Sequence, residues 1–332
     1  MGAIIITFLA LQSVEHSRPW PEEFNSPKAE WTQLKTLNGY NYETNSYLII
    51  ADQIIRKNKV NEIATLAESV HRALILFPIQ LIYKDKTENK KKHVVRIFEE
   101  ESEYFKSGSP KGTIGYFDGR TEEVRVLLNH LIEKKNEGSN LQPRQRYRVL
   151  THELIHQAMG DQFHALPTWL SEGMAEYFSA TQYAPGRYRF VNSSKQIIDH
   201  LNVVWLHGKH KTVVIPSIKT LTIMSAHTWA KDNRTNEKNA YAKYAGALFL
   251  THYQMELASR NLGGLRGFLE NSVNNIHNHK TKSVRFAPAD QAMLWKDKSF
   301  NKIESQICEY WKKKGLDIRF TGKINTAEPI EK

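Results

Sequence analysis

Cysteine is almost absent from this chain of 332 residues, in which Cys308 is the only one. An internal disulfide and a zinc site built from cysteines are therefore excluded. No apolar run approaches the roughly 20 residues that a membrane-spanning helix needs, which excludes an integral membrane protein. Internal repeats and low-complexity tracts are also lacking, and the composition is close to that of average globular proteins. A core formed without covalent cross-links is expected.

Positive charge exceeds negative charge, with 46 Lys and Arg against 35 Asp and Glu, a formal net charge of +11. The basic residues are scattered, and their densest run, residues 84–93 (KDKTENKKKH), is interpreted as a solvated loop. The sequence has neither a basic helix nor an aromatic and basic RNA-binding signature, so we predict no nucleic-acid partner. An anionic polymer of the cell envelope stays open as a partner of the basic surface.

The N-terminus carries the apolar stretch AIIITFLAL at residues 3–11. We interpret residues 1–13 as a signal peptide, which predicts a periplasmic or secreted protein, although a charged n-region and an A-x-A cleavage site are missing. The alternative is a first buried strand, and in that case the protein stays in the cytoplasm.

The order of the expected elements predicts an α+β fold. Residues 14–44 contain three prolines and little periodicity, which indicates a linker or loosely packed arm. Strands are expected at residues 46–51 and 94–98, a hairpin at residues 113–128 around Asp118-Gly119, and a helix at residues 61–77. From residue 144 onward the pattern is mainly helical. We therefore expect a small mixed or antiparallel sheet in the N-terminal half and helices in the C-terminal half.

The domain boundaries follow from the same reading. Residues 45–180 should contain the sheet and the helices of the functional site. Residues 181–320 should be a mainly helical part of the same unit, and residues 321–332 a polar tail.

The motif HELIH at residues 152–156 carries the strongest chemical signal. His152 and His156 are four residues apart, so on a helix both imidazoles lie on one face and can reach one cation. Glu153 lies beside that cation and can take a proton from an attacking water molecule. A helix over residues 144–159 is expected because the stretch has no Pro or Gly until Gly160.

A hydrolytic zinc site needs a third protein ligand. The pattern HExxHxxGxxH does not supply it, because Met159 and Gln162 occupy the positions of its Gly and third His. A second helix is expected to begin near Pro167, and there Glu172 and Glu176 share one face. Two carboxylates beside a pair of histidines are costly unless a cation or hydrogen-bond donors lie between them.

HELIH, then fifteen residues, then Glu172 as the first Glu of WLSEGMAEYF is a pattern that resembles the gluzincin superfamily of zinc metallopeptidases, and especially a group of uncharacterised bacterial peptidase sequences. The resemblance implies a zincin-like fold and one Zn²⁺ per chain. It also implies that His152, His156 and Glu172 are the zinc ligands and that Glu153 is the general base. Glu176 matches a carboxylate that holds a ligand histidine, as ligating imidazoles generally require.

Gluzincins usually add a Tyr or His that stabilises the oxyanion, and Tyr241 and Tyr244 are the candidates here, with Tyr241 favoured. Core or surface packing is an equal alternative for either side chain. An edge strand within residues 113–117 could bind an extended peptide, and Gly115 would allow the peptide backbone to approach closely.

These observations predict a zinc-dependent peptidase that hydrolyses peptide bonds of a peptide or protein substrate. The alternatives are a catalytically inactive binding protein of the cell envelope with the zincin fold, and a helical protein in which HExxH is fortuitous. The intact His152, His156 and Glu153 favour the enzyme.

Overall fold

The computed structural model describes residues 21–36, 39–77, 92–131, 147–160, 166–203, 212–235, 237–258, 263–279, 291–295 and 298–321. The expected signal peptide, nearly all of the polar tail and the basic run at residues 84–91 lie outside these ranges. Among the described helices, none combines the length and the apolar character that crossing a bilayer requires.

The largest sheet of the described chain is six-stranded and mixed, with the order β2-β3-β4-β5-β7-β6. Its strands are β2 (Thr32–Thr36), β3 (Gly39–Glu43), β4 (Tyr47–Ala51), β5 (His93–Phe98), β6 (Gly115–Asp118) and β7 (Glu123–Leu127). Strands β4, β5 and β7 are parallel, whereas β3 and β6 pair antiparallel with their neighbours. Parallel neighbours require a crossover, which α1 (Lys57–Leu76) provides between β4 and β5.

The strand predictions for residues 46–51 and 94–98 and the hairpin prediction are confirmed. The linker prediction for residues 14–44 is wrong for the described residues, which form β1 (Glu23–Asn25), β2 and β3. Strand β1 pairs with β9 (Arg187–Arg189), and β2 and β3 form a hairpin at the sheet edge. Strand β2 is exposed along its whole length, so it lacks the apolar alternation by which a strand is recognised in sequence.

Helices cover the apolar face of the sheet. On that face Ile49, Val95, Ile97, Val124 and Val126 are buried, as the alternation of side chains along strands requires. Helices α1 and α4 (Arg148–Met159) contact each other, and α4 contacts β6 and β7. The sequence predicted α4 correctly where it is described, including its end at Gly160, whose φ of 48° is one that glycine adopts readily.

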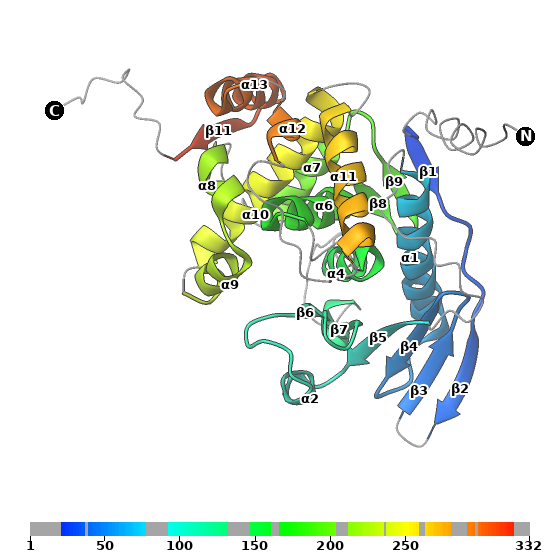
Figure 1. The fold of residues 1–332 in the computed structure, drawn as a ribbon. Coiled ribbons are helices and arrows are strands. Elements are labelled where there is room, and N and C mark those ends of the chain that lie inside the picture. The colour runs from blue at the N-terminus through cyan, green and yellow to red at the C-terminus, as the bar shows by residue number, and fades with distance from the viewer. Residues whose placement is uncertain are drawn as a thin grey trace, which may run out of the picture.

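The C-terminal half is mainly helical and packs on the other side of α4 (Figure 1). Its first helix, α6 (Thr168–Thr181), begins directly after Pro167, as expected, and packs on both α4 and α10 (Glu237–His252). The remaining elements are α2 (Glu101–Lys106), a 3-10 helix (Leu128–His130), β8 (Gln182–Ala184), α7 (Ser194–Leu201), β10 (Thr212–Ile215), α8 (Ile218–Ile223), α9 (Ala226–Thr235), a π-helix (Tyr253–Leu257), α11 (Gly263–His279), α12 (Ala292–Trp295), α13 (Phe300–Lys313) and β11 (Asp317–Phe320). The fold is thus α+β, with α4 between the sheet and the helical half.

Candidate metal centre

Helix α4 presents two imidazoles side by side. The Nε2 atoms of His152 and His156 lie 3.0 Å apart, as the i, i+4 spacing on one helix face predicts. The side chains are 13% and 5% exposed. The pair therefore lies at the edge of the core.

Glu172 reaches the same point from α6, which packs against α4. Its Oε2 atom lies 3.3 Å from His152 Nε2 and 3.5 Å from His156 Nε2. A tetrahedral zinc ion with ligand distances of about 2.0–2.1 Å separates its ligand atoms by about 3.3 Å. The three atoms therefore have the spacing of three corners of such a tetrahedron, and they form the one three-residue metal-ligand group found in the described chain.

The charges of these side chains are coupled. Burial alone would raise the pKa of Glu172, but the adjacent His156 and His152 lower it to about 2. Burial likewise opposes a proton on His152, yet hydrogen bonds to Glu172 and Glu176 raise its pKa well above the usual value. Positive charge is thus strongly favoured between the two carboxylates. A divalent cation would supply that charge, and its binding would displace the proton.

Glu153 lies on the neighbouring face of α4, toward the sheet. Its Oε2 atom accepts a hydrogen bond of 2.8 Å from the backbone N–H of Phe117 in β6. Burial raises the pKa of Glu153, and the neighbouring His152 and His156 partly oppose this effect. A carboxylate with a raised pKa is a better proton acceptor at neutral pH than an ordinary one.

Gly115 has a packing role in addition to the expected one. A Cβ atom at this position would lie 2.3 Å from Val149 Cγ1 and 3.3 Å from Glu153 Cγ. The absence of a side chain therefore lets β6 pack closely against α4. The small residue thereby allows Glu153 to reach the strand. Its expected part in binding a peptide along the strand edge stays a prediction.

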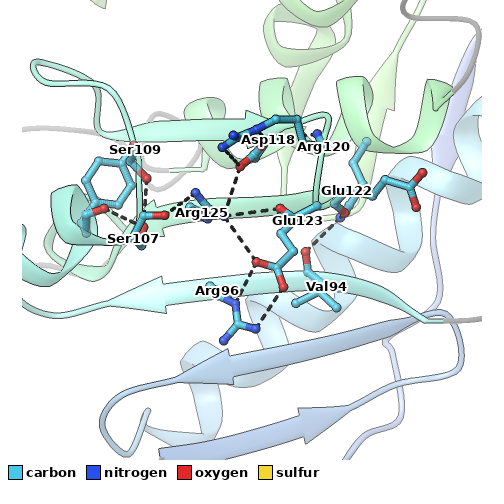
Figure 2. A network of polar contacts seen from close by, with 12 residues as sticks. Val94, Arg96, Ser107, Ser109, Asp118, Arg120, Glu122, Glu123 and Arg125 are labelled. Carbon is cyan, nitrogen blue, oxygen red and sulfur yellow. Dashed lines mark hydrogen bonds and ion pairs between the residues drawn. The ribbon is translucent and has the colours of Figure 1, made fainter. Parts of the chain in front are cut away.

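A polar network on the opposite face of the sheet holds the β6–β7 hairpin in place (Figure 2). Asp118 lies 3.2 Å from Arg125 Nη2 and accepts hydrogen bonds from Arg120. Arg125 donates to the carbonyl of Ser107 at 2.7 Å, and Glu123 accepts both hydrogen bonds of a bidentate pair from Arg96. These contacts fix the backbone of β6 and thereby the N–H group that Glu153 uses.

Gln157 attaches α4 to the sheet and was not singled out from the sequence. Its amide nitrogen donates to the carbonyls of Val94 and Glu122, at 2.9 and 2.8 Å. The residue is buried, and it directly follows the second histidine of the motif. A glutamine one turn after Glu153, and so on the same side of the helix, is the signal from which this anchor could have been inferred.

Glu176 lies where the resemblance places it. Its Oε1 atom is 3.0 Å from His152 Nδ1, on the far side of the ring from Glu172. Its other oxygen is 2.7 Å from Nε2 of His200 in α7. His200 was missed in the sequence, because it is 24 residues from Glu176 and belongs to no motif.

The structure brings Tyr244, rather than the favoured Tyr241, next to the candidate ligands. The ring centroid of Tyr244 is 6.0 Å from that of His152, with the rings edge to face, whereas Tyr241 is 42% exposed. The two residues are three apart on α10, and the helix turns the first of them toward solvent. Trp229 packs edge-on against Tyr244, with 5.4 Å between the ring centroids, and holds it in this orientation.

Comparisons of the sequence with protein-family models and with curated proteins found no match. The case for a function therefore rests on the geometry of the centre formed by His152, His156 and Glu172, with Glu153, Glu176 and Tyr244 around it.

Proposed function

We propose that the protein is a zinc-dependent peptidase of gluzincin type that hydrolyses peptide bonds in peptides or proteins. The observation that carries the proposal is the triangle formed by His152 Nε2, His156 Nε2 and Glu172 Oε2, with sides of 3.0, 3.3 and 3.5 Å. These ligand types match those of catalytic zinc sites with two His and one Glu, which leave a fourth position open.

The surrounding residues support hydrolysis. A zinc ion held by the three side chains would polarise a carbonyl group and lower the pKa of a water molecule to about 7. Glu153 takes the proton of the attacking water and then passes it to the leaving amine. Tyr244, whose ring packs against that of His152, would donate a hydrogen bond to the oxyanion.

The neighbouring strand offers a way to hold an extended substrate. In the described chain β6 is one of the two edge strands of the sheet, and it is the one beside Glu153. Ile114 accepts a hydrogen bond from Leu127 on the β7 side, whereas the N–H of Phe117 points to the opposite edge, where Glu153 accepts it. A peptide that adds to this edge by main-chain hydrogen bonds would pass next to the proposed base.

The proposal is tested by the zinc content of the purified protein. We expect one zinc per wild-type chain, and a loss or strong weakening of binding in Glu172→Ala and His156→Ala, because each variant leaves only two protein ligands. Glu101→Ala and His227→Ala change exposed residues outside the site and should retain the metal. Elemental analysis after dialysis and reconstitution measures the content. Wild-type protein without zinc after reconstitution would overturn the proposal.

The role of Tyr244 gives a second expected result. Tyr244→Phe should lower kcat about 100-fold, the usual cost of removing one oxyanion donor, while zinc content is unchanged. Tyr241→Phe removes the hydroxyl of the exposed neighbour, and its kcat should stay within about twofold of the wild-type value. Cleavage of labelled casein measures both variants. Equal effects of the two substitutions would exclude Tyr244 as the donor.

A further inference from the structure

Glu176 joins two imidazoles that come from different helices. Its Oε1 atom is 3.0 Å from His152 Nδ1 in α4, and its Oε2 atom is 2.7 Å from His200 Nε2 in α7. An ionised carboxylate only accepts hydrogen bonds, so both ring nitrogens must donate.

His200 is neutral and has one defined tautomer. Its side chain is 3% exposed, and burial together with the positive charge of Arg148 lowers its pKa to about 4. A neutral imidazole carries a single N–H group. Because Glu176 takes that hydrogen at Nε2, Nδ1 of His200 is left as an acceptor on the opposite side of the ring.

His200 also lines a small pocket. Its walls are formed by Arg148, Ser179, Ala180, Gln182, Gln196, Asp199 and His200. Within the described chain three buried atoms of these walls have no hydrogen-bond partner, namely Arg148 Nε, Gln196 Oε1 and His200 Nδ1. One donor and two acceptors match the hydrogen-bonding capacity of one water molecule. Such a water would hold His200 in the tautomer that Glu176 requires.

We infer that His200 is a positioning residue for the metal centre, which acts through Glu176 to fix the ring plane and tautomer of His152. The inference rests on the proposed zinc site and extends it to α7. With the Nε2–H of His200 in place, one carboxylate oxygen is occupied and the other is aimed at His152 Nδ1. Without the hydrogen bond from His200, the Glu176 carboxylate can rotate away from His152. The His152 ring is then no longer held with its Nε2 atom toward Glu172 and His156.

Zinc affinity tests this chain of contacts. His200→Ala should weaken zinc binding of the folded protein about tenfold, the lower end of the loss when a partner outside the ligands is removed. His200→Gln places an amide N–H near the position of the histidine Nε2 atom, so its zinc affinity should stay within about threefold of the wild-type affinity. His200→Asn is too short to reach Glu176 and should resemble His200→Ala. Competition with a chelator measures all three affinities.

Two controls separate positioning from a general loss of structure. His252 is as deeply buried in α10 and lies outside the site, so His252→Ala should destabilise the fold without changing the zinc affinity of the folded protein. In a Glu176→Ala background, His200→Ala should cause no further loss of affinity, because the carboxylate through which it acts has been removed.

The outcomes are distinct. A wild-type protein that binds no zinc overturns the proposed function and this inference together. A wild-type protein that binds zinc with an affinity unchanged by His200→Ala overturns the inference alone. An equal loss from His200→Ala with and without Glu176, or equal effects of His200→Gln and His200→Asn, also overturns it.

Discussion

Replacing Glu153 with glutamine is expected to reduce peptide hydrolysis by a factor of about 10²–10⁴, the usual contribution of a general base, while one zinc per chain is retained. Glutamine keeps a side-chain carbonyl that can accept the hydrogen bond from the N–H of Phe117, which Glu153 accepts at 2.8 Å. The contact with β6 therefore survives, and only the capacity to take a proton is lost.

The measurement combines zinc analysis with cleavage of an internally quenched peptide library by wild type and variant. Glu101→Gln, which makes the same chemical change at an exposed position of α2, should behave as wild type. Cleavage by Glu153→Gln at the wild-type rate would exclude Glu153 as the base. Zinc bound by both proteins, with cleavage by neither, would favour the alternative of an inactive binding protein.

Replacing Gly173 with alanine should have the largest effect on folding. Gly173 follows the candidate ligand Glu172 on α6, where this helix crosses α10. A Cβ atom there would lie 2.1 Å from Thr251 Oγ1 and 2.6 Å from the backbone oxygen of Ala247. A backbone atom cannot move aside as the end of a flexible side chain can. We expect the free energy of unfolding to fall by about 3 kcal/mol, at the upper end of the usual cost of overpacking.

Gly267 in α11 is the matched control, because it is also a glycine inside a helix. A Cβ atom at Gly267 would meet only the terminal methyl of Met293, at 2.9 Å, and the Met293 side chain is 40% exposed. Gly267→Ala should leave stability unchanged or raise it by up to about 1 kcal/mol through helix propensity. Urea unfolding of both variants measures the difference. Equal stabilities would show that the crossing of α6 and α10 can relax.

A displacement of α6 in Gly173→Ala should also change the geometry of the candidate metal centre. Glu172 directly precedes Gly173, so a shift of the helix changes the distances from Oε2 to the two imidazoles, which are 3.3 and 3.5 Å. The folded fraction of Gly173→Ala is therefore expected to bind zinc more weakly than wild type.

Local periodicity was enough to predict several elements. The apolar runs of β4 and β5, the Asp118-Gly119 turn and the helical spacing of α1 are each contained in a short stretch of chain. The same holds for α4 and α6, which carry the HELIH and WLSEGMAEYF segments. A ligand pair at i, i+4 needs only a helix to bring it together, so the juxtaposition of His152 with His156 could be predicted from the sequence.

Contacts between distant segments needed the tertiary structure. Strand β1 pairs with β9 across more than half of the described chain, and neither strand is long enough to have a recognisable pattern. The choice between Tyr241 and Tyr244 depended on how α10 is rotated about its axis, and that rotation is set by its packing on α6, where Gly173 permits the close crossing.

The sequence by itself determined the fold class, the two helices of the candidate site and the residue types that can bind a cation. Only the tertiary structure decided that Gly115 makes room for α4, and that His200 is the second partner of Glu176. The physical reason is that periodicity records which face of an element is buried, whereas the identity of the group buried against that face depends on the packing of segments remote in the chain.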